Sequence, residues 1–271
     1  MADGHATVGA ALRSHPRMRA LQHRLTGPAR RVALPVLTGN GRGLRVSVGE
    51  SIMRVASRGE PQVEKAYLDL LSPGDVVYDV GANIGWYSLL AARAVGPSGS
   101  VMAFEPSLEN AVLAQRNAVV NGLANITVVP AALTDEEGWM TFIQKGSLEG
   151  RLEKDDSEEQ AHRKAKRRIV GVSGRTLVPI TTLDSWLART GRPAPTLVKI
   201  DVEGAEVGVL RGMEQTLRNT RPTLIVELHG TRDEVADQLD SLDYEHSAIE
   251  RDVPTREAPW WAHVLARPAE R

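Results

Sequence analysis

The chain has 271 residues, of which 42% are hydrophobic and 25% charged, with a formal net charge of −1 and no cysteine. This composition excludes global disorder, disulfides and thiol chemistry, and the near-neutral charge gives no general attraction to nucleic acid. No apolar run approaches the roughly 18 residues of a membrane span, and Met1–Arg19 lacks the apolar core of a secretory signal. We therefore predict a cytoplasmic globular protein with neither a membrane span nor a nucleic-acid partner.

The N-terminal part of the chain, 1–59, is predicted to be separate from the main domain. Residues 5–31 are rich in arginine and alanine and carry apolar residues at near-helical spacing, which predicts a helical arm. Two short apolar runs joined by the glycine-rich segment 38–43 then predict a hairpin. The arm most simply presents a solvated face; a substrate lid, a homodimer contact or a contact with an anionic surface are the alternatives.

The main domain, 60–271, alternates between apolar runs and amphipathic stretches. Strands are expected at 76–80, 101–105, 126–131, 197–201, 224–228, 244–249 and 263–266, and helices at 60–71, up to 94, 108–121, 205–218 and 233–242. This alternation predicts an α/β fold with a mostly parallel, doubly wound sheet, which the last two strands close as an antiparallel pair.

A charged insert, about 145–170, interrupts this alternation. It contains the runs DDSEE and RKAKRR and almost no apolar residues, and short strands at 139–144 and 178–181 flank it. We expect a mobile loop or an exposed helix here.

The strongest functional pattern is the turn Asp79-Val-Gly-Ala-Asn-Ile-Gly85 between the first buried strand and its helix. Gly81 and Gly85 permit a sharp turn close to a ligand. Asn83 stands where the dinucleotide fingerprint has its middle glycine, the residue that lets a pyrophosphate lie against the backbone. The pattern favours a nucleoside cofactor without phosphates, such as S-adenosylmethionine (SAM), over a nicotinamide cofactor and an oxidoreductase.

Further residues are candidates for contacts with this cofactor. Glu105 ends the next strand, where it can accept hydrogen bonds from both ribose hydroxyls. Asp79 can orient the methionine ammonium, Ala131 and Ala132 leave room for adenine, and Asn110 either contacts adenine or only begins a helix. The rings at 86 and 87 either lie near the sulfonium or pack in the core. The predicted cofactor site comprises Asp79, Gly81, Ala82, Asn83, Gly85, Glu105, Pro106, Ala132 and Asp201.

The second cluster runs from Lys199 to Glu206, at the end of a buried strand. If the strand continues, Asp201 and Glu203 share a face, and two such acids repel each other unless something binds them. Glu206 is expected to interact with a helix dipole. Glu227 and His229 end the neighbouring strand on one face, and His229 is the natural general base because it titrates near neutral pH.

The predicted catalytic residues are therefore Asp201, Glu203 and His229, which would accept the proton of an acceptor hydroxyl. A divalent metal held by these three residues would instead lower the pKa of that hydroxyl. Nothing in the spacing requires a metal, so a metal-free mechanism is favoured.

Taken together these motifs resemble the FkbM family of SAM-dependent methyltransferases. The resemblance covers residues 60–230 and excludes the arm and the insert. It implies a Rossmann-like class I methyltransferase sheet of seven strands with one antiparallel edge, and methyl transfer to oxygen, often on polyketide or sugar hydroxyls. The motifs are Asp79–Ser88, Ala103–Pro106, Asn117 with Asn121, Ala131–Asp135, Thr182–Asp184, Lys199–Glu206 and Glu227–His229.

The resemblance makes an O-methyltransferase that acts on a hydroxylated small molecule the leading prediction, as part of natural product biosynthesis. A non-catalytic SAM-binding partner protein, with the charged insert as its contact, is a further alternative. A nucleic-acid methyltransferase is disfavoured because Asp201-Val-Glu-Gly204 replaces the Asn/Asp-Pro-Pro-Tyr/Phe signature of those enzymes.

Overall fold

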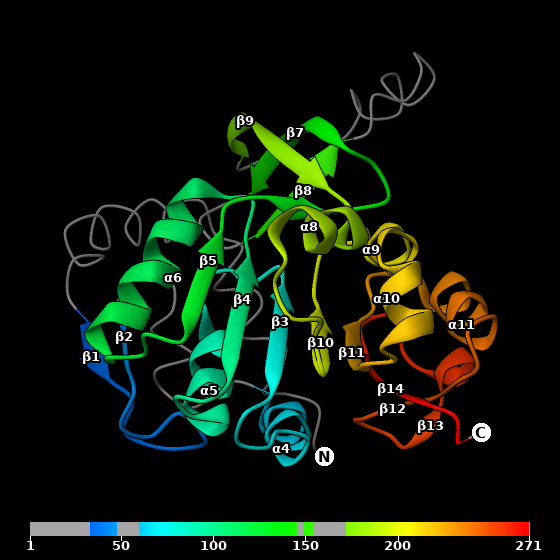
Figure 1. Ribbon diagram of the computed structural model, residues 1–271, viewed down its shortest axis with the longest axis horizontal. Helices are drawn as coiled ribbons and strands as arrows, with labels where there is room; N and C mark the ends of the chain where they lie inside the picture. Colours follow the sequence, from blue (N-terminus) through cyan, green and yellow to red (C-terminus); the bar gives the residue numbers. More distant parts are fainter. Residues whose placement is uncertain (1–32, 48–59, 146–148, 154–171, 271) are drawn as a thin grey trace, which may run out of the picture. The chain divides into compact units, whose positions relative to one another are not determined.

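The computed structural model describes residues 33–47, 60–145, 149–153 and 172–270 (Figure 1). The chain divides into two compact units, 1–59 and 60–271. In the first unit, β1 (Ala33–Pro35) and β2 (Arg45–Ser47) pair antiparallel as the predicted hairpin. The predicted helical arm and most of the charged insert lie outside the described residues. No helix among the described residues is long and apolar enough to cross a membrane.

A large sheet forms the centre of the second unit. Its described strands follow the order β13-β12-β14-β11-β10-β3-β4-β5, and the five strands from β11 to β5 are parallel. Their bounds are β3 Val76–Val80, β4 Ser100–Phe104, β5 Ile126–Val129, β10 Leu197–Ile200, β11 Thr223–Glu227, β12 Tyr244–Ala248, β13 Val253–Pro254 and β14 His263–Pro268. The expected α/β fold with a mostly parallel sheet is thus present.

One detail of the expected sheet differs. The described sheet has eight strands rather than seven, because the two-residue strand β13 pairs antiparallel with β12 and forms the edge. The antiparallel strand β14 lies between β11 and β12 and pairs with both. Its residues Val264 and Ala266 are fully buried there. An inserted strand of this kind hides more apolar surface than an edge strand would.

Helices cover both faces of this sheet. The adjacent residues Tyr78 and Asp79 of β3 point to opposite faces, as successive residues of a strand must. Asp79 meets Ser88 of α5, whereas Tyr78 belongs to the apolar core under the other helices. On the first side lie α4 (Pro61–Asp69), α5 (Trp86–Val95) and α6 (Leu108–Val120); on the second lie α8 (Leu183–Thr190), α9 (Glu206–Gly212), α10 (Glu214–Asn219) and α11 (Arg232–Asp240).

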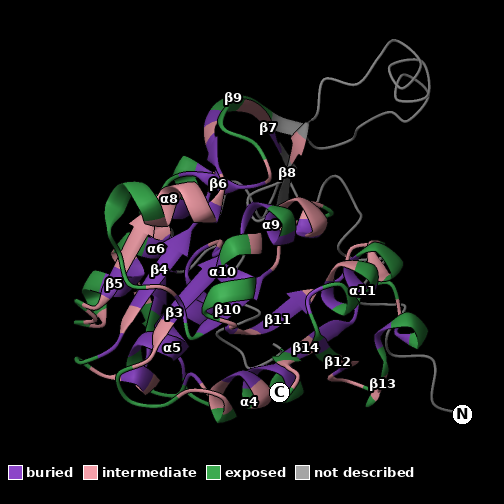
Figure 2. Cartoon of the chain, turned by 45° about the vertical axis from the view of Figure 1, so that its right-hand side comes forward, coloured by how far each residue is buried: buried purple, intermediate pink, exposed green. Residues whose placement is uncertain are grey.

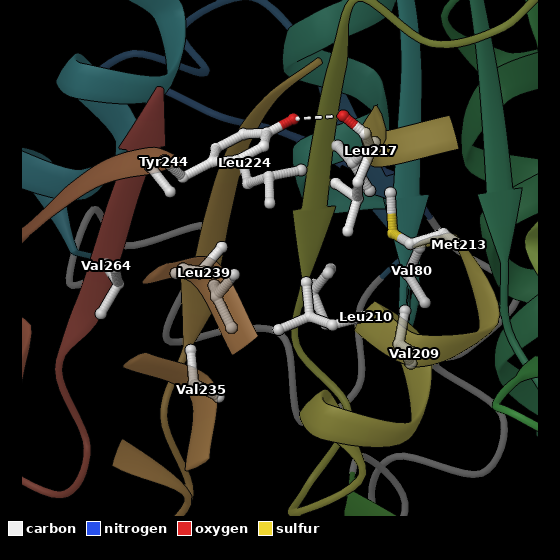
Figure 3. Packing of buried hydrophobic residues seen from close by; sticks show 14 of the residues in the cluster. Val80, Val209, Leu210, Met213, Leu217, Leu224, Val235, Leu239, Tyr244 and Val264 are labelled. Carbon is white, nitrogen blue, oxygen red and sulfur yellow. Dashed lines mark hydrogen bonds between the residues drawn. The ribbon is translucent and has the colours of Figure 1, made fainter. Parts of the chain in front are cut away.

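The core on the second side is continuous and apolar. Figure 2 shows the central strands buried along their length, and Figure 3 shows side chains of α9, α10 and α11 packed on β3, β11 and β14. Leu210 and Leu217 are fully buried in it. The hydroxyl of Tyr244 donates a hydrogen bond to the carbonyl of Leu217, so even the polar atom of this ring is satisfied.

The expected helix 205–218 is broken into α9 and α10. At Gly212 a Cβ would overlap the carbonyl oxygen of Thr134, so the chain passes very close to another backbone there. The new helix α10 begins under Asp184, whose carboxylate accepts hydrogen bonds from the backbone N–H groups of Gln215 and Thr216. The Thr182–Asp184 motif therefore has a structural role, since Asp184 satisfies N–H groups that the start of a helix leaves unpaired.

A second sheet lies across the end of the large one (Figure 1). It pairs β6 (Ala132–Leu133), β9 (Val172–Thr181), β7 (Gly138–Lys145) and β8 (Glu149–Glu153) in that order. The cross-strand neighbours Phe142 and Leu152 face the ends of β3 and β4. Apart from β9, which begins six residues earlier than expected, the predicted strands are present with ends within two residues of their predicted positions.

We predict that Leu210→Ala lowers the free energy of unfolding by about 3 kcal/mol, because it removes a fully buried side chain from a core that cannot close the cavity. Leu108→Ala, at a leucine that is 60% exposed, should change it by less than about 0.5 kcal/mol. Urea denaturation followed by circular dichroism measures both. Equal losses in the two variants would contradict this assignment of the core.

Candidate active site

The glycine turn after β3 is built from left-handed backbone. Gly81, Asn83 and Gly85 have φ angles of 82°, 53° and 83°. Asparagine is among the few non-glycine residues that adopt this region readily, which explains Asn83. A Cβ at Gly81 would overlap the carbonyl oxygen of Asp201, and one at Gly85 would press on Ala114 of α6. The glycines thus allow the turn to pack against Asp201 and Ala114. The sequence had suggested only that they make room for a ligand.

Glu105 closes this turn onto the next strand. It follows β4, is 5% exposed, and accepts hydrogen bonds from the backbone N–H groups of Asn83 (2.7 Å) and Ser107 (2.8 Å). Burial raises the pKa of Glu105 to about 7. Each carboxylate oxygen can accept a second hydrogen bond, so the predicted contact with a ribose remains open to this side chain.

A pocket lies at the ends of β3, β4 and β10, beneath the second sheet. One residue in its wall, Asn110, is 4% exposed, and its Oδ1 atom makes no hydrogen bond. A buried polar atom of this kind usually pairs with a water molecule or a ligand, so this oxygen is available to one. The wall also contains the small residues Ala131 and Ala132, the apolar residues Val80, Phe104, Leu133, Phe142, Leu152, Val202 and Ala205, and Gly81, Asn83, Glu105, Pro106, Asp201 and Glu203.

Most of the residues predicted to bind the cofactor therefore meet in one pocket. Asp79, Ala82 and Gly85 are not in its wall. Asp79 is 1% exposed and accepts a hydrogen bond from Ser88 Oγ. Burial raises its pKa in spite of the nearby Lys199 ammonium. The sequence suggested that Asp79 faces the crevice. In the structure Asp79 is buried and is not part of the pocket wall.

Lys199 and Asp201 form an ion pair at the same wall, in which the lysine is buried and the aspartate side chain is 27% exposed. Lys199 is 1% exposed, and its Nζ donates to Asp201 Oδ2 at 2.9 Å. Burial acts to raise the pKa of Asp201, but the Lys199 ammonium outweighs it and holds that pKa at about 2. The ammonium also lies 4.5 Å from the ring centroid of Tyr87. Asp201 is therefore an ionised carboxylate at the pocket.

The rings at 86 and 87 take part in packing. The indole N–H of Trp86 donates to Glu64 at 2.8 Å, and Tyr87 packs edge-on against Tyr67 with ring centroids 5.2 Å apart. Neither ring is in the pocket wall. The structure therefore supports the core-packing interpretation of these two residues.

The expectation that Asp201 and Glu203 share a strand face was wrong. The strand β10 ends at Ile200, and the next four residues form a turn in which Glu203 has a φ of 49°. Glu203 is exposed at the pocket and does not join the group formed by Asp201. Strand alternation does not apply once the ladder has ended.

His229 is positioned by Glu206, which lies in the first turn of α9 as expected and has further partners that the sequence did not reveal. His229 Nδ1 lies 2.9 Å from Glu206 Oε1, and Glu206, which is fully buried, also accepts hydrogen bonds from Gly204 N and Thr231 Oγ1. Glu206 is thus a hydrogen-bond centre for two loops. Burial acts to lower the pKa of His229, but the bond to Glu206 prevails and raises it to about 9. In this arrangement His229 carries a proton at neutral pH.

Two residues outside the predicted site complete the cluster. The carboxylate of Glu227 lies between two imidazoles, with Oε1 3.7 Å from His229 Nε2 and Oε2 3.3 Å from His263 Nε2. His263 Nδ1 is 2.7 Å from Glu250 Oε1. The shared face of Glu227 and His229 was visible in the sequence. His263 carried no signal, because only the pairing of β11 with β14 brings it opposite Glu227.

The chain is similar in sequence to known methyltransferases. Residues 79–251 match the methyltransferase FkbM domain family. Hexuronic acid methyltransferase AglP of Haloferax volcanii is 28% identical over 207 residues, 75% of this chain and 77% of that protein. The 31-O-demethyl-FK506 methyltransferase FkbM of Streptomyces tacrolimicus is 32% identical over 180 residues, 59% of this chain and 67% of that protein. A crystal structure of a methyltransferase FkbM from Methylobacillus flagellatus, 15% identical, covers 79% of this chain and 52% of its own at a TM-score of 0.47.

We predict that Glu105→Gln changes how stability depends on pH. The folded protein binds the Glu105 proton more tightly than the unfolded chain, because burial raises the pKa from 4.5 to about 7. The stability gained from that proton is complete below pH 4.5 and is lost as the pH rises through 7, a change of roughly 3 kcal/mol.

The unfolding free energy of wild type minus that of Glu105→Gln should therefore fall by roughly 3 kcal/mol from pH 4.5 to pH 8. Urea titrations at several pH values measure this difference. Glu245→Gln, which changes an exposed carboxylate, should track the wild type throughout. A constant difference for Glu105→Gln across the range would show that this carboxyl does not titrate as described.

Proposed function

The chain belongs to the FkbM methyltransferase family and is a methyltransferase, and we propose that it transfers the methyl group of SAM to a hydroxyl group of a small molecule. The observation that carries this proposal is the pocket at the ends of β3, β4 and β10, where an unpartnered Asn110 oxygen, the Glu105 carboxylate and the ionised Asp201 line one wall. We assign these three groups to the adenine, the ribose and the reacting centre of SAM, respectively.

The residues present fit this cofactor. Asn110 Oδ1 is placed to accept a hydrogen bond from an adenine amino group, beside Ala131 and the ring of Phe142. Glu105 can accept hydrogen bonds from ribose hydroxyls at its remaining lone pairs. When bound, SAM would supply a methyl group on a positively charged sulfur. The ionised Asp201 and the surplus of carboxylates around it suit that charge.

The chemical class of the acceptor is proposed from the names of the relatives, and its position from Asp201 and Glu203. One relative is named for a hexuronic acid and another for an O-methyl group of FK506, so a hydroxyl on a sugar or a polyketide is the proposed class. With a pKa of about 2, Asp201 is a weak base, and we assign it the orientation of the acceptor hydroxyl. Glu203, at the exposed rim of the pocket, is placed to pass the released proton to water.

Calorimetry tests the cofactor and separates the alternatives. The protein should bind SAM and S-adenosylhomocysteine but not NADH. The reason is that Asn83 occupies the position of the middle glycine, which lets a pyrophosphate lie against the backbone in dinucleotide-binding turns. Incubation with labelled SAM and a cell extract should then transfer label to a small molecule. Binding of NADH alone would favour the oxidoreductase, and SAM binding without any transfer would favour a non-catalytic partner protein.

We predict that Asn110 selects the adenine base. Wild type should bind S-adenosylhomocysteine at least about tenfold more tightly than S-inosylhomocysteine, which has a carbonyl in place of the amino group and would set an acceptor against Asn110 Oδ1. Asn110→Ala should bind the two compounds with similar affinity. Calorimetry of the four combinations measures this, and undiminished discrimination in the variant would place adenine elsewhere.

We predict that Asp201→Asn lowers turnover by about 100-fold, the cost of lost positioning, and leaves affinity for S-adenosylhomocysteine nearly unchanged. The amide keeps the size of the side chain but loses the charge that orients the acceptor hydroxyl. Asp252→Asn, at an exposed aspartate, is the matched control and should behave as wild type. If Asp201→Asn turns over at the wild-type rate, Asp201 is structural; if it loses cofactor affinity as well, it belongs to the cofactor site.

A further inference from the structure

Three strands bring potential metal ligands to one level at the end of the sheet. Lys199 pairs in register with Ile225 of β11, so Asp201, two residues later, comes opposite Glu227. Glu227 is in turn paired with His263 of β14. His229 follows two residues after Glu227. A carboxylate, a second carboxylate and two imidazoles therefore converge although they lie far apart in sequence.

Both imidazoles are held in the manner of metal-binding histidines. His229 Nδ1 lies 2.9 Å from Glu206 and His263 Nδ1 lies 2.7 Å from Glu250. Each bond leaves Nε2 pointing away from its carboxylate, and both Nε2 atoms face Glu227. A carboxylate on one ring nitrogen fixes the ring and raises the basicity of the other nitrogen, and such partners accompany nearly all metal-binding histidines.

The Nε2 atoms of both imidazoles lie near Glu227 without forming a hydrogen bond. His263 is 2% exposed, and its Nε2 atom lies 3.3 Å from Glu227 Oε2 and 3.5 Å from Glu60 Oε2. His229 Nε2, at 3.7 Å from Glu227 Oε1, is beyond hydrogen-bond distance. One ligand atom each from Asp201, Glu227 and His229 lies within 4.8 Å of the others, a spacing that a single ion can bridge with small side-chain movements.

We propose that Asp201, Glu227 and His229 bind one divalent cation of the first transition row. Mixed carboxylate and imidazole ligands suit Mn²⁺, Fe²⁺ or Zn²⁺ better than Ca²⁺ or Mg²⁺, which prefer oxygen. Glu227 is the central ligand, and His263 Nε2 faces its second oxygen at 3.3 Å. Binding of the ion displaces the proton that His229 carries in the metal-free protein. The sequence favoured a metal-free mechanism and a different trio; the register of β10 and β11 replaces Glu203 by Glu227 in that set and reverses the preference.

The use of this ion rests on the proposed function. Asp201 belongs both to the ion site and to the pocket wall, so an acceptor hydroxyl in the pocket can bind the ion. A bound cation lowers the pKa of such a hydroxyl, and the proton can leave toward Glu203. This arrangement needs no strong general base among the residues of the cluster.

Titration of the full-length protein with Mn²⁺, after removal of metals with EDTA, tests the site directly. Electron paramagnetic resonance reports free Mn²⁺, and wild type should remove one equivalent from solution. Glu227→Gln, which neutralises the shared ligand, should bind at least about tenfold more weakly, and His229→Gln should do the same. Zn²⁺ should displace the Mn²⁺ in competition.

The matched control is His246→Asn, which alters another imidazole held by a carboxylate, Asp240, away from the cluster. It should bind Mn²⁺ as wild type does. The proposal is overturned if wild type leaves all Mn²⁺ free with Zn²⁺ equally unbound, or if Glu227→Gln and His229→Gln, shown folded by circular dichroism, bind as wild type.

Calorimetry with S-adenosylhomocysteine in EDTA separates this proposal from the proposed function. Cofactor binding and full turnover without metal would overturn the cation site and leave the methyltransferase proposal intact. Metal binding without any binding of S-adenosylhomocysteine would overturn the cofactor and leave the cation site standing.

Discussion

A lysine ammonium buried beneath the pocket organises the end of the large sheet. Lys199 cannot remain charged in the interior without partners, because an uncompensated buried charge costs several kcal/mol. Its partners are Asp79 on β3 and Asp201 just beyond β10, and both raise the pKa of the ammonium against the effect of burial. The pair draws Asp201 to the pocket wall and holds it ionised. The choice of Lys199 in an otherwise apolar strand thus determines the charge and position of the residue nearest the proposed chemistry.

The part of the pocket proposed for the cofactor, formed by the glycine turn, Glu105 and Asn110, depends on a second constraint. This constraint is the close approach of the glycine turn to its neighbours. Gly81 lies against the carbonyl of Asp201, and Glu105 ties the turn to β4 through Asn83. The turn therefore connects the two halves mechanically, since a shift of β10 would displace the wall that Glu105 and Asn110 share.

Local patterns predicted the fold well and located most of the residues that meet at the pocket, because these depend on neighbours in sequence. The apolar runs located β3, β4, β10 and β11, and the turn with Glu105 identified one wall of the pocket. The acceptor half was predicted less well, because it depends on strand register. Glu203 was chosen by alternation along a strand that in fact ends at Ile200. His263 and the positioning role of Glu206 arise from pairings across more than twenty residues, which a periodic pattern does not encode.

The position of β14 also affects the order in which parts of the sheet can form during synthesis. The strands that line the cofactor half, β3 to β6, are complete once residue 133 has been synthesised. His263, which faces Glu227, arrives only with β14, which inserts between β11 and β12. During translation the chain passes through a stage in which β11 exposes an unpaired edge, although every residue that lines the pocket has already been made. Non-local pairing of this kind is slow and leaves such edges open to aggregation. Pairing of β14 therefore brings His263 opposite Glu227 and also covers the edge of β11 through which the nascent chain could aggregate.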